Sequence, residues 1–265
     1  MASLVWGRDP QEAYKEPYEY GIQEQFVREA RSLFLELYRL LNSESHRYKV
    51  DDRSMEKAVW LLSMDALDSA RDCLDSLTRK DHRVAGKLFR DLMESMDIAA
   101  YFHSATTDSR SALVKWYADE VVPHRKYREH VKKTQGDRAS TQLAKHYGNL
   151  SRFTHRSYHA ILDGYILDAN DQIIHDRTEE TWRDPDGSAN LLVLAQTISS
   201  YYAALASLVQ EYMSELSALG IVNPDEIKSA FTSSMESETV PRRFRTRREI
   251  QQGLNTTAME RKTFG

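Results

Sequence analysis

The sequence is poor in the residues that cross-link or interrupt a chain. It has one cysteine in 265 residues, so no disulfide can form within the chain, as suits a reducing cytoplasm. That residue, Cys73, stands in the apolar run LDSARDCLDSL, where we expect a buried and inert thiol. Ten glycines and six prolines leave few places for a helix to break. Long helices are therefore expected.

Membrane segments and an excess of one charge are also lacking. No apolar stretch approaches the ~18 residues needed to span a bilayer, and the N-terminus lacks the pattern of a secretory signal. Lys and Arg total 36 against 40 Asp and Glu, a net charge of -4, which excludes a global field that draws the chain onto nucleic acid or an anionic membrane. We expect a cytoplasmic protein, and the 41% of hydrophobic residues suffice for a substantial core.

The common catalytic signatures are absent. The sequence contains no G-x-x-x-x-G-K-[ST], G-x-G-x-x-G or G-x-S-x-G, which excludes the usual nucleotide cradles and the esterase nucleophile elbow. It contains no H-E-x-x-H, and no histidine has a glutamate three residues before it, as in di-iron bundles. We expect neither a cofactor nor a metal site.

What is present is helical periodicity. Apolar residues recur every three to four positions in six long segments, 18–41, 54–78, 81–103, 109–133, 137–162 and 188–219, and in a short one, 223–235. Pro123 must kink or split the fourth segment, because proline lacks an amide donor. Gly136 and Asp137 are a C-cap glycine followed by an N-cap aspartate, which separates the fourth segment from the fifth.

The organisation along the chain follows from these segments. Residues 165–167 and 172–174 are mostly apolar and flank a polar turn, the pattern of a short β-hairpin. We predict an all-α domain over residues 18–235, an antiparallel bundle of about six long helices with a hairpin at about 165–174. Residues 1–17 form an N-terminal extension. Residues 236–265 are highly charged, and we expect an extended or disordered tail.

The segment 137–162 concentrates the chemistry. One helical stripe is expected to face the core, and the opposite side is cationic. The stripe consists of Leu143, Tyr147, Leu150, Thr154, Tyr158 and Ile161; the cationic side consists of Lys145, Arg152, His155, Arg156 and His159. Two imidazoles and a guanidinium on one face suit metal-independent RNA cleavage, in which imidazoles move protons and arginine holds the phosphate. A solvated surface, or a face paired with carboxylates of another helix, gives the same pattern.

The same residues carry a resemblance. A long-helix chain with an arginine and a histidine four to six residues apart resembles the HEPN superfamily, helical ribonucleases and toxins of bacterial defence with an R-x4-6-H motif at a dimer interface. Arg152 to His159 satisfies the six-residue form, and Arg125 to His130 the four-residue form. NLSRFTHRSYH also resembles a segment of abortive-infection-type relatives. The resemblance implies catalysis by Arg152 and His159, with His155 as a third member of the face, and a homodimer.

Two further groups of residues are candidates for the site. Arg90 and Glu94 stand at i and i+4, where they form either a surface pair or, under a covering helix, a carboxylate that orients His155 or His159. The tail carries an arginine run with one aromatic residue, and such a run can bind phosphates or serve as a partner-binding arm. Its members are Arg242, Arg243, Arg245, Arg247 and Arg248.

Two functions remain open on the sequence alone. The first is a HEPN-like defence or toxin-type protein that cleaves RNA through Arg152, His159 and His155, supported by Glu94, Arg90 and Arg156. The second is a non-enzymatic interaction or regulatory subunit whose cationic helix face or arginine tail docks an acidic protein or nucleic acid. RNA and a protein are thus both open as partners, and no membrane contact is expected.

Overall fold

The computed structural model describes residues 20–79, 81–154, 158, 166–167, 173–174 and 189–235. The predicted N-terminal extension, residues 1–17, and the predicted tail, residues 236–265, lie outside the described residues. The described helices are α2 (Tyr20–Leu41), the 3-10 turn η1 (Glu44–His46), α3 (Met55–Thr78), α4 (His82–His103), α5 (Thr107–Trp116), α6 (His124–Thr154), α9 (Ala189–Ala218) and α10 (Pro224–Ser234). The predicted all-α class is confirmed.

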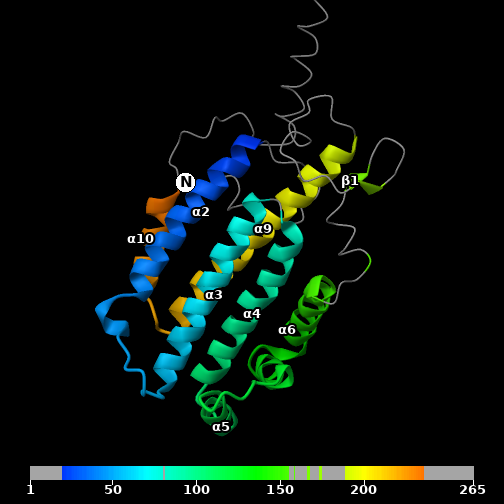
Figure 1. The fold of residues 1–265 in the computed structure, drawn as a ribbon. Helices are drawn as coiled ribbons and strands as arrows, with labels where there is room; N and C mark the ends of the chain where they lie inside the picture. Colours follow the sequence, from blue (N-terminus) through cyan, green and yellow to red (C-terminus); the bar gives the residue numbers. More distant parts are fainter. Residues whose placement is uncertain are drawn as a thin grey trace, which may run out of the picture.

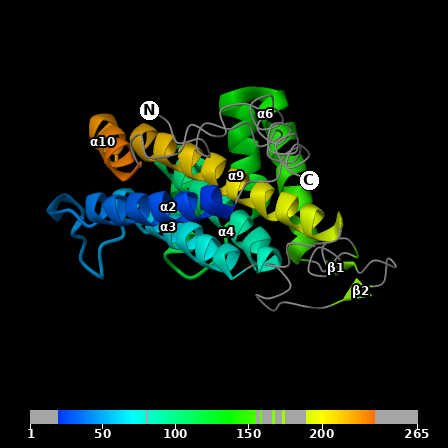
Figure 2. The ribbon, with the colours of Figure 1, turned by 90° about the horizontal axis from the view of Figure 1, so that it is seen from above.

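The long helices pack side by side around α3. Helix α3 packs against α2, α4 and α9, and α9 also packs against α4 (Figure 1). Helix α10 packs on α2 and α9, at the side of the molecule away from α6 (Figure 2). Helix α6 packs on α4, so it covers the side of α4 that α3 and α9 leave open.

Two groups of buried side chains hold these helices together. The larger group joins α2, α3, α4, α9 and α10 through residues such as Phe26, Leu37, Leu67, Leu92 and Val209. The smaller group joins α3 and α4 to α5 and α6 through Val59, Phe102, Leu113, Tyr127 and Tyr147. Helix α6 therefore contributes mainly tyrosines to the core, where the other long helices contribute aliphatic side chains.

Helix boundaries follow the capping residues in the sequence. The side chains of Ser54 and Thr106 accept hydrogen bonds from backbone amides in the first turns of α3 and α5. Asn223 and Glu226 form a capping box at the start of α10, with Pro224 in the first turn. The cysteine expected in the core, Cys73, is fully buried in α3, and burial raises its pKa well above the ordinary value.

Two interruptions shape the chain between α4 and the end of α6. The segment predicted over 109–133 is split before Pro123, so α5 ends at Trp116 and α6 begins at His124. At Gly136 the backbone has φ 88° and ψ 173°, which lies outside the helical region and bends α6 into two halves. Almost only glycine adopts this combination, because a Cβ would clash with the backbone.

Two short strands, β1 (Ile166–Leu167) and β2 (Ile173–Ile174), pair antiparallel. Ile166 lies opposite Ile174 and Leu167 opposite Ile173. The intervening residues 168–172 lie outside the described residues, so the hairpin itself stays a prediction. Within the part of the chain that the structure describes, no helix has both the length and the apolar content to cross a membrane.

The bend in α6 can be tested with two matched glycine substitutions. Gly136→Ala forces a side chain into a backbone conformation that favours glycine and should lower the free energy of unfolding by ~1–3 kcal/mol. Gly148 lies in regular helix with no atom within 4 Å of an added Cβ. Gly148→Ala should therefore raise the free energy of unfolding by ~0.5–1 kcal/mol. Urea unfolding measures both, and equal effects would contradict the assigned bend.

Candidate functional site

The α4–α6 polar cluster consists of Arg90 and Glu94 from α4 and His124, Tyr127 and Ser151 from α6. The Arg90 guanidinium connects its members: Nε donates to Glu94 Oε1 at 2.7 Å, and Nη1 donates to Ser151 Oγ at 3.3 Å. Its Nη2 lies 3.2 Å from His124 Nε2. The side chain of Arg90 is 17% exposed and that of Glu94 24%, so this ion pair is largely covered by α6.

The hydrogen bonds fix the proton position on His124. A guanidinium only donates, so Nε2 of His124 must accept from Arg90, which leaves the imidazole proton on Nδ1. Nδ1 is hydrogen-bonded to the Tyr127 hydroxyl and lies 3.6 Å from Glu94 Oε1. With 44% of its side chain exposed, His124 is the member of the cluster most open to a ligand.

Two tyrosines of α6 form the wall beneath the imidazole. The rings of Tyr127 and Tyr147 are 1% exposed, and the His124 ring packs edge-on against both, at 5.5 and 6.1 Å between centroids. The Arg128 guanidinium lies over the Tyr147 ring, 5.5 Å from its centroid. Burial raises the pKa of both phenols, so each keeps its proton and can donate a hydrogen bond.

The Tyr147 hydroxyl donates to Asp97 Oδ2 at 2.7 Å, which forms a second polar link between α6 and α4. Burial raises the pKa of Asp97 from its ordinary value of 3.8 to about 6. The hydrogen bond from Tyr147 opposes this rise, whereas the negative charges of Glu215, Glu94 and Glu211 add to it. Burial and nearby carboxylates therefore disfavour the charged form of Asp97, and the hydrogen bond from Tyr147 is the main contact that stabilises it.

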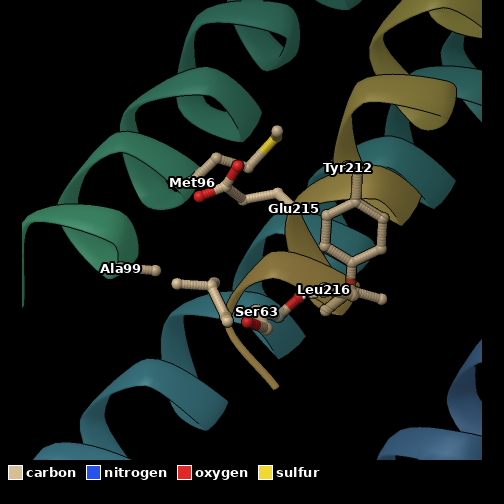
Figure 3. Close-up of a pocket in the computed structure, with 7 residues that line it drawn as sticks. Ser63, Met96, Ala99, Tyr212, Glu215 and Leu216 are labelled. Carbon is tan, nitrogen blue, oxygen red and sulfur yellow. Dashed lines mark hydrogen bonds between the residues drawn. The ribbon is translucent and has the colours of Figure 1, made fainter. Parts of the chain in front are cut away.

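The acidic surroundings of Asp97 continue onto α9. Burial raises the pKa of Glu211 and that of Glu215. A nearby histidine opposes each rise: His146 for Glu211 and His103 for Glu215. Glu215 lines a shallow pocket where α3, α4 and α9 meet, and its side chain extends from α9 toward Met96 of α4 (Figure 3). The pocket is lined by Ser63, Met96, Ala99, Tyr212, Glu215, Leu216 and Leu219. It is narrow and mostly apolar, and we assign it no ligand.

The α4–α6 polar cluster has the groups for proton transfer on a phosphodiester. Glu94 and Tyr127 orient an imidazole, and Arg90 places a cation beside it. A phosphate that drew Arg90 away from His124 would free Nε2 to take a proton. Among the described side chains, no three of His, Cys, Asp or Glu lie close enough together to hold a metal ion.

The structure places part of the predicted site. Arg90 and Glu94 are paired under a covering helix, and the imidazole beside them is that of His124. Arg152 lies in the last described turn of α6, directly after Ser151. The predicted His155, Arg156 and His159, and the tail arginines Arg242, Arg243, Arg245, Arg247 and Arg248, lie outside the described residues.

The inward face predicted for the segment 137–162 is confirmed only in part. Leu143 and Leu150 pack against the core and Tyr147 is buried, so the predicted inward face is confirmed at these positions. The same prediction is wrong for Tyr158, which is 70% exposed. In the second R-x4-H match, Arg125 is exposed, whereas His130 packs 5.8 Å from the ring of Tyr101.

Sequence reasoning missed four residues of this region, His124, Tyr127, Tyr147 and Asp97, as members of a site. The i, i+3 pair of His124 and Tyr127 directly after Pro123 was the available local signal, because both residues then face the same side of a new helix. No local signal connects the three residues of α6 to Arg90 or Asp97, because these lie on α4.

The energetic role of Arg90 can be tested with a double-mutant cycle. Arg90→Met should lower the free energy of unfolding by ~2–3 kcal/mol, because it leaves the Glu94 carboxylate largely buried without its partner. Adding Glu94→Leu should recover much of that loss. Arg39→Met, which breaks the exposed pair with Glu36, should cost only ~0.2–1 kcal/mol. Equal losses for Arg90→Met and Arg39→Met would contradict the assigned burial.

The raised pKa of Asp97 predicts a pH dependence of stability. The pKa of Asp97 is about 6 in the folded protein, against an ordinary value of 3.8. Protonated Asp97 therefore favours folding at low pH, and this contribution to the free energy of unfolding is lost as pH rises through 6. Asp97→Asn keeps an acceptor for Tyr147 and should increase the free energy of unfolding above pH 7 by up to ~3 kcal/mol, with little gain near pH 4. Urea unfolding against pH measures this. Asp51→Asn, at an exposed loop position, is the control, and an Asp97→Asn gain that does not change with pH would refute the assignment.

Comparison with known proteins identifies no relative of this chain. No family model, no curated protein and no solved structure matches the chain.

Proposed function

We propose that the chain is a HEPN-like bacterial defence or toxin-type protein that cleaves RNA without a metal ion. Arg152 holds the scissile phosphate, and His159, with His155 nearby, transfers protons to and from the reacting oxygens. Arg90, Glu94 and Arg156 support these groups, and the site is completed across a homodimer axis, as in the family that the motif resembles. The finer architecture, an antiparallel bundle of about six long helices with a hairpin at 165–174, is part of the same proposal.

The observation that carries the proposal is the hydrogen bond from Arg90 Nη1 to Ser151 Oγ. It attaches the last turn of α6, which includes the backbone of Arg152, to a helix that supplies a carboxylate and a second guanidinium. His124 lies in the same cluster, with Nδ1 oriented by Glu94 and Tyr127. An RNA phosphate near residue 152 would thus meet groups able to bind charge and to move protons.

A second candidate function is a non-enzymatic interaction subunit. It is favoured by the hydrogen bonding within the α4–α6 polar cluster, where Arg90 is engaged by three protein groups and His124 by two. Side chains satisfied in this way can serve to attach α6 and nothing more. In that case the cationic surface of α6 docks an acidic partner without chemistry.

An RNA cleavage assay separates the two candidates. Labelled RNA incubated with the full chain and EDTA should be cut, and His159→Ala or Arg152→Ala should reduce the rate by ~100-fold or more. His46→Ala, purified in parallel, is the control, because His46 lies in η1, outside the α4–α6 polar cluster, where it contacts Ser43. No cleavage by the unmodified chain, or equal cleavage by all variants, would reject the ribonuclease and leave the interaction subunit.

A further inference from the structure

Positive charge is concentrated in α6. The 31 residues of this helix include eight Lys or Arg and two Asp or Glu, in a chain whose net charge is -4. By contrast, α3 carries five Asp or Glu against two Lys or Arg. Among the described helices, α6 therefore has the largest excess of positive charge.

Four of these cations are solvent-exposed and form no ion pair with any described residue: Arg125, Lys133, Arg138 and Lys145. The neighbouring Lys126 and Lys132 do have carboxylate partners, Asp108 and Asp137. A cation without a carboxylate partner remains available to an external polyanion. Its binding is favoured because counterions condensed on that polyanion are released.

Helical register lines up the cations of the second half of α6. Arg138 and Lys145 are seven residues apart, so they lie on the same side of the helix, two turns or ~10.5 Å apart along its axis. Position 152 follows at the same interval. Lys145 is two residues before the buried Tyr147, a rotation of about 200°, which directs this line away from α4.

The exposed side chains between these cations are mostly uncharged, with two carboxylates among them: Glu129, between Arg125 and Lys133, and Asp137, which pairs with Lys132. Thr134, Gln135, Thr141 and Gln142 are all exposed and uncharged, and the nearby apolar side chains Val131, Leu143 and Tyr147 are buried or partly buried. A protein interface needs apolar or aromatic anchors at its centre, which this side of α6 lacks. A membrane surface needs a free apolar face, and that of α6 is used against α4. In the second half of α6, the spacing of Arg138 and Lys145 among hydroxyl and amide groups suits a phosphate backbone.

We propose that the exposed side of α6, defined by Arg125, Lys133, Arg138 and Lys145, binds the phosphate backbone of RNA. Spaced cations on both sides of the Gly136 bend contact phosphates, and the line in the second half leads toward position 152. The choice of RNA as the polyanion rests on the proposed function. The surface itself rests on the exposure and register of the four cations.

The test measures binding separately from cleavage. Fluorescence anisotropy with a labelled, uncleavable 2′-O-methyl RNA should show that Arg138→Gln combined with Lys145→Gln weakens binding by ~10-fold at low salt. The slope of log affinity against log salt should become shallower by about 0.7 for each cation removed. Arg53→Gln combined with Lys228→Gln removes the same charge from exposed positions before α3 and in α10, and should change affinity by less than about twofold. Circular dichroism verifies that each variant is folded.

Three outcomes would overturn the assignment. Affinity unchanged by the α6 variants but lost on removal of residues 236–265 would assign RNA binding to the tail. Equal weakening by the control pair would reduce the effect to net charge, and equally tight, equally affected binding of poly-glutamate would remove the specificity for RNA. Cleavage by the unmodified chain in the separate assay would uphold the ribonuclease in each of these cases, whereas intact binding without cleavage would uphold the surface alone.

Discussion

The position of α6 on α4 depends on the hydrogen bonds that the Arg90 guanidinium makes to both helices. Arg90 donates to Glu94 on its own helix and to Ser151 and His124 near the two ends of α6. Since the two contacts on α6 are 27 residues apart in sequence and separated by the Gly136 bend, the same side chain ties together both halves of a helix that has few aliphatic residues to bury. These polar contacts act together with the buried rings of Tyr127 and Tyr147, which pack α6 against α4.

This arrangement has an electrostatic cost. Covering α4 with α6 and α9 places Glu94, Asp97, Glu211 and Glu215 near one another, and burial raises the pKa of the last three. One phenol and one guanidinium offset part of this cost through Tyr147 and Arg90. Groups with shifted pKa values are more frequent at functional sites than in purely structural cores, and Asp97 brings one such group to the α4–α6 contact.

The sequence predicts the helices well and the site only partly. Local residues determine where α3 and α10 begin and where α6 bends: Ser54, Asn223 and Gly136, respectively. These features can therefore be derived from periodicity and capping. The site depends on which helix covers α4, a contact between residues 34 to 61 positions apart that no local pattern encodes. Glu94 could be identified as a carboxylate in need of a partner, but His124 could not be identified as the imidazole beside it.

The lone thiol in the middle of α3 has a practical consequence. Cys73 has no exposed surface, its sulfur faces the carbonyl of Ala85, and burial disfavours its thiolate. Alkylating reagents can modify it only when the interior opens, so the native chain stays chemically silent toward maleimides. A cysteine introduced on the outer side of α6 would then be the single reactive handle, and a dye attached there would report on that helix without any other site being removed.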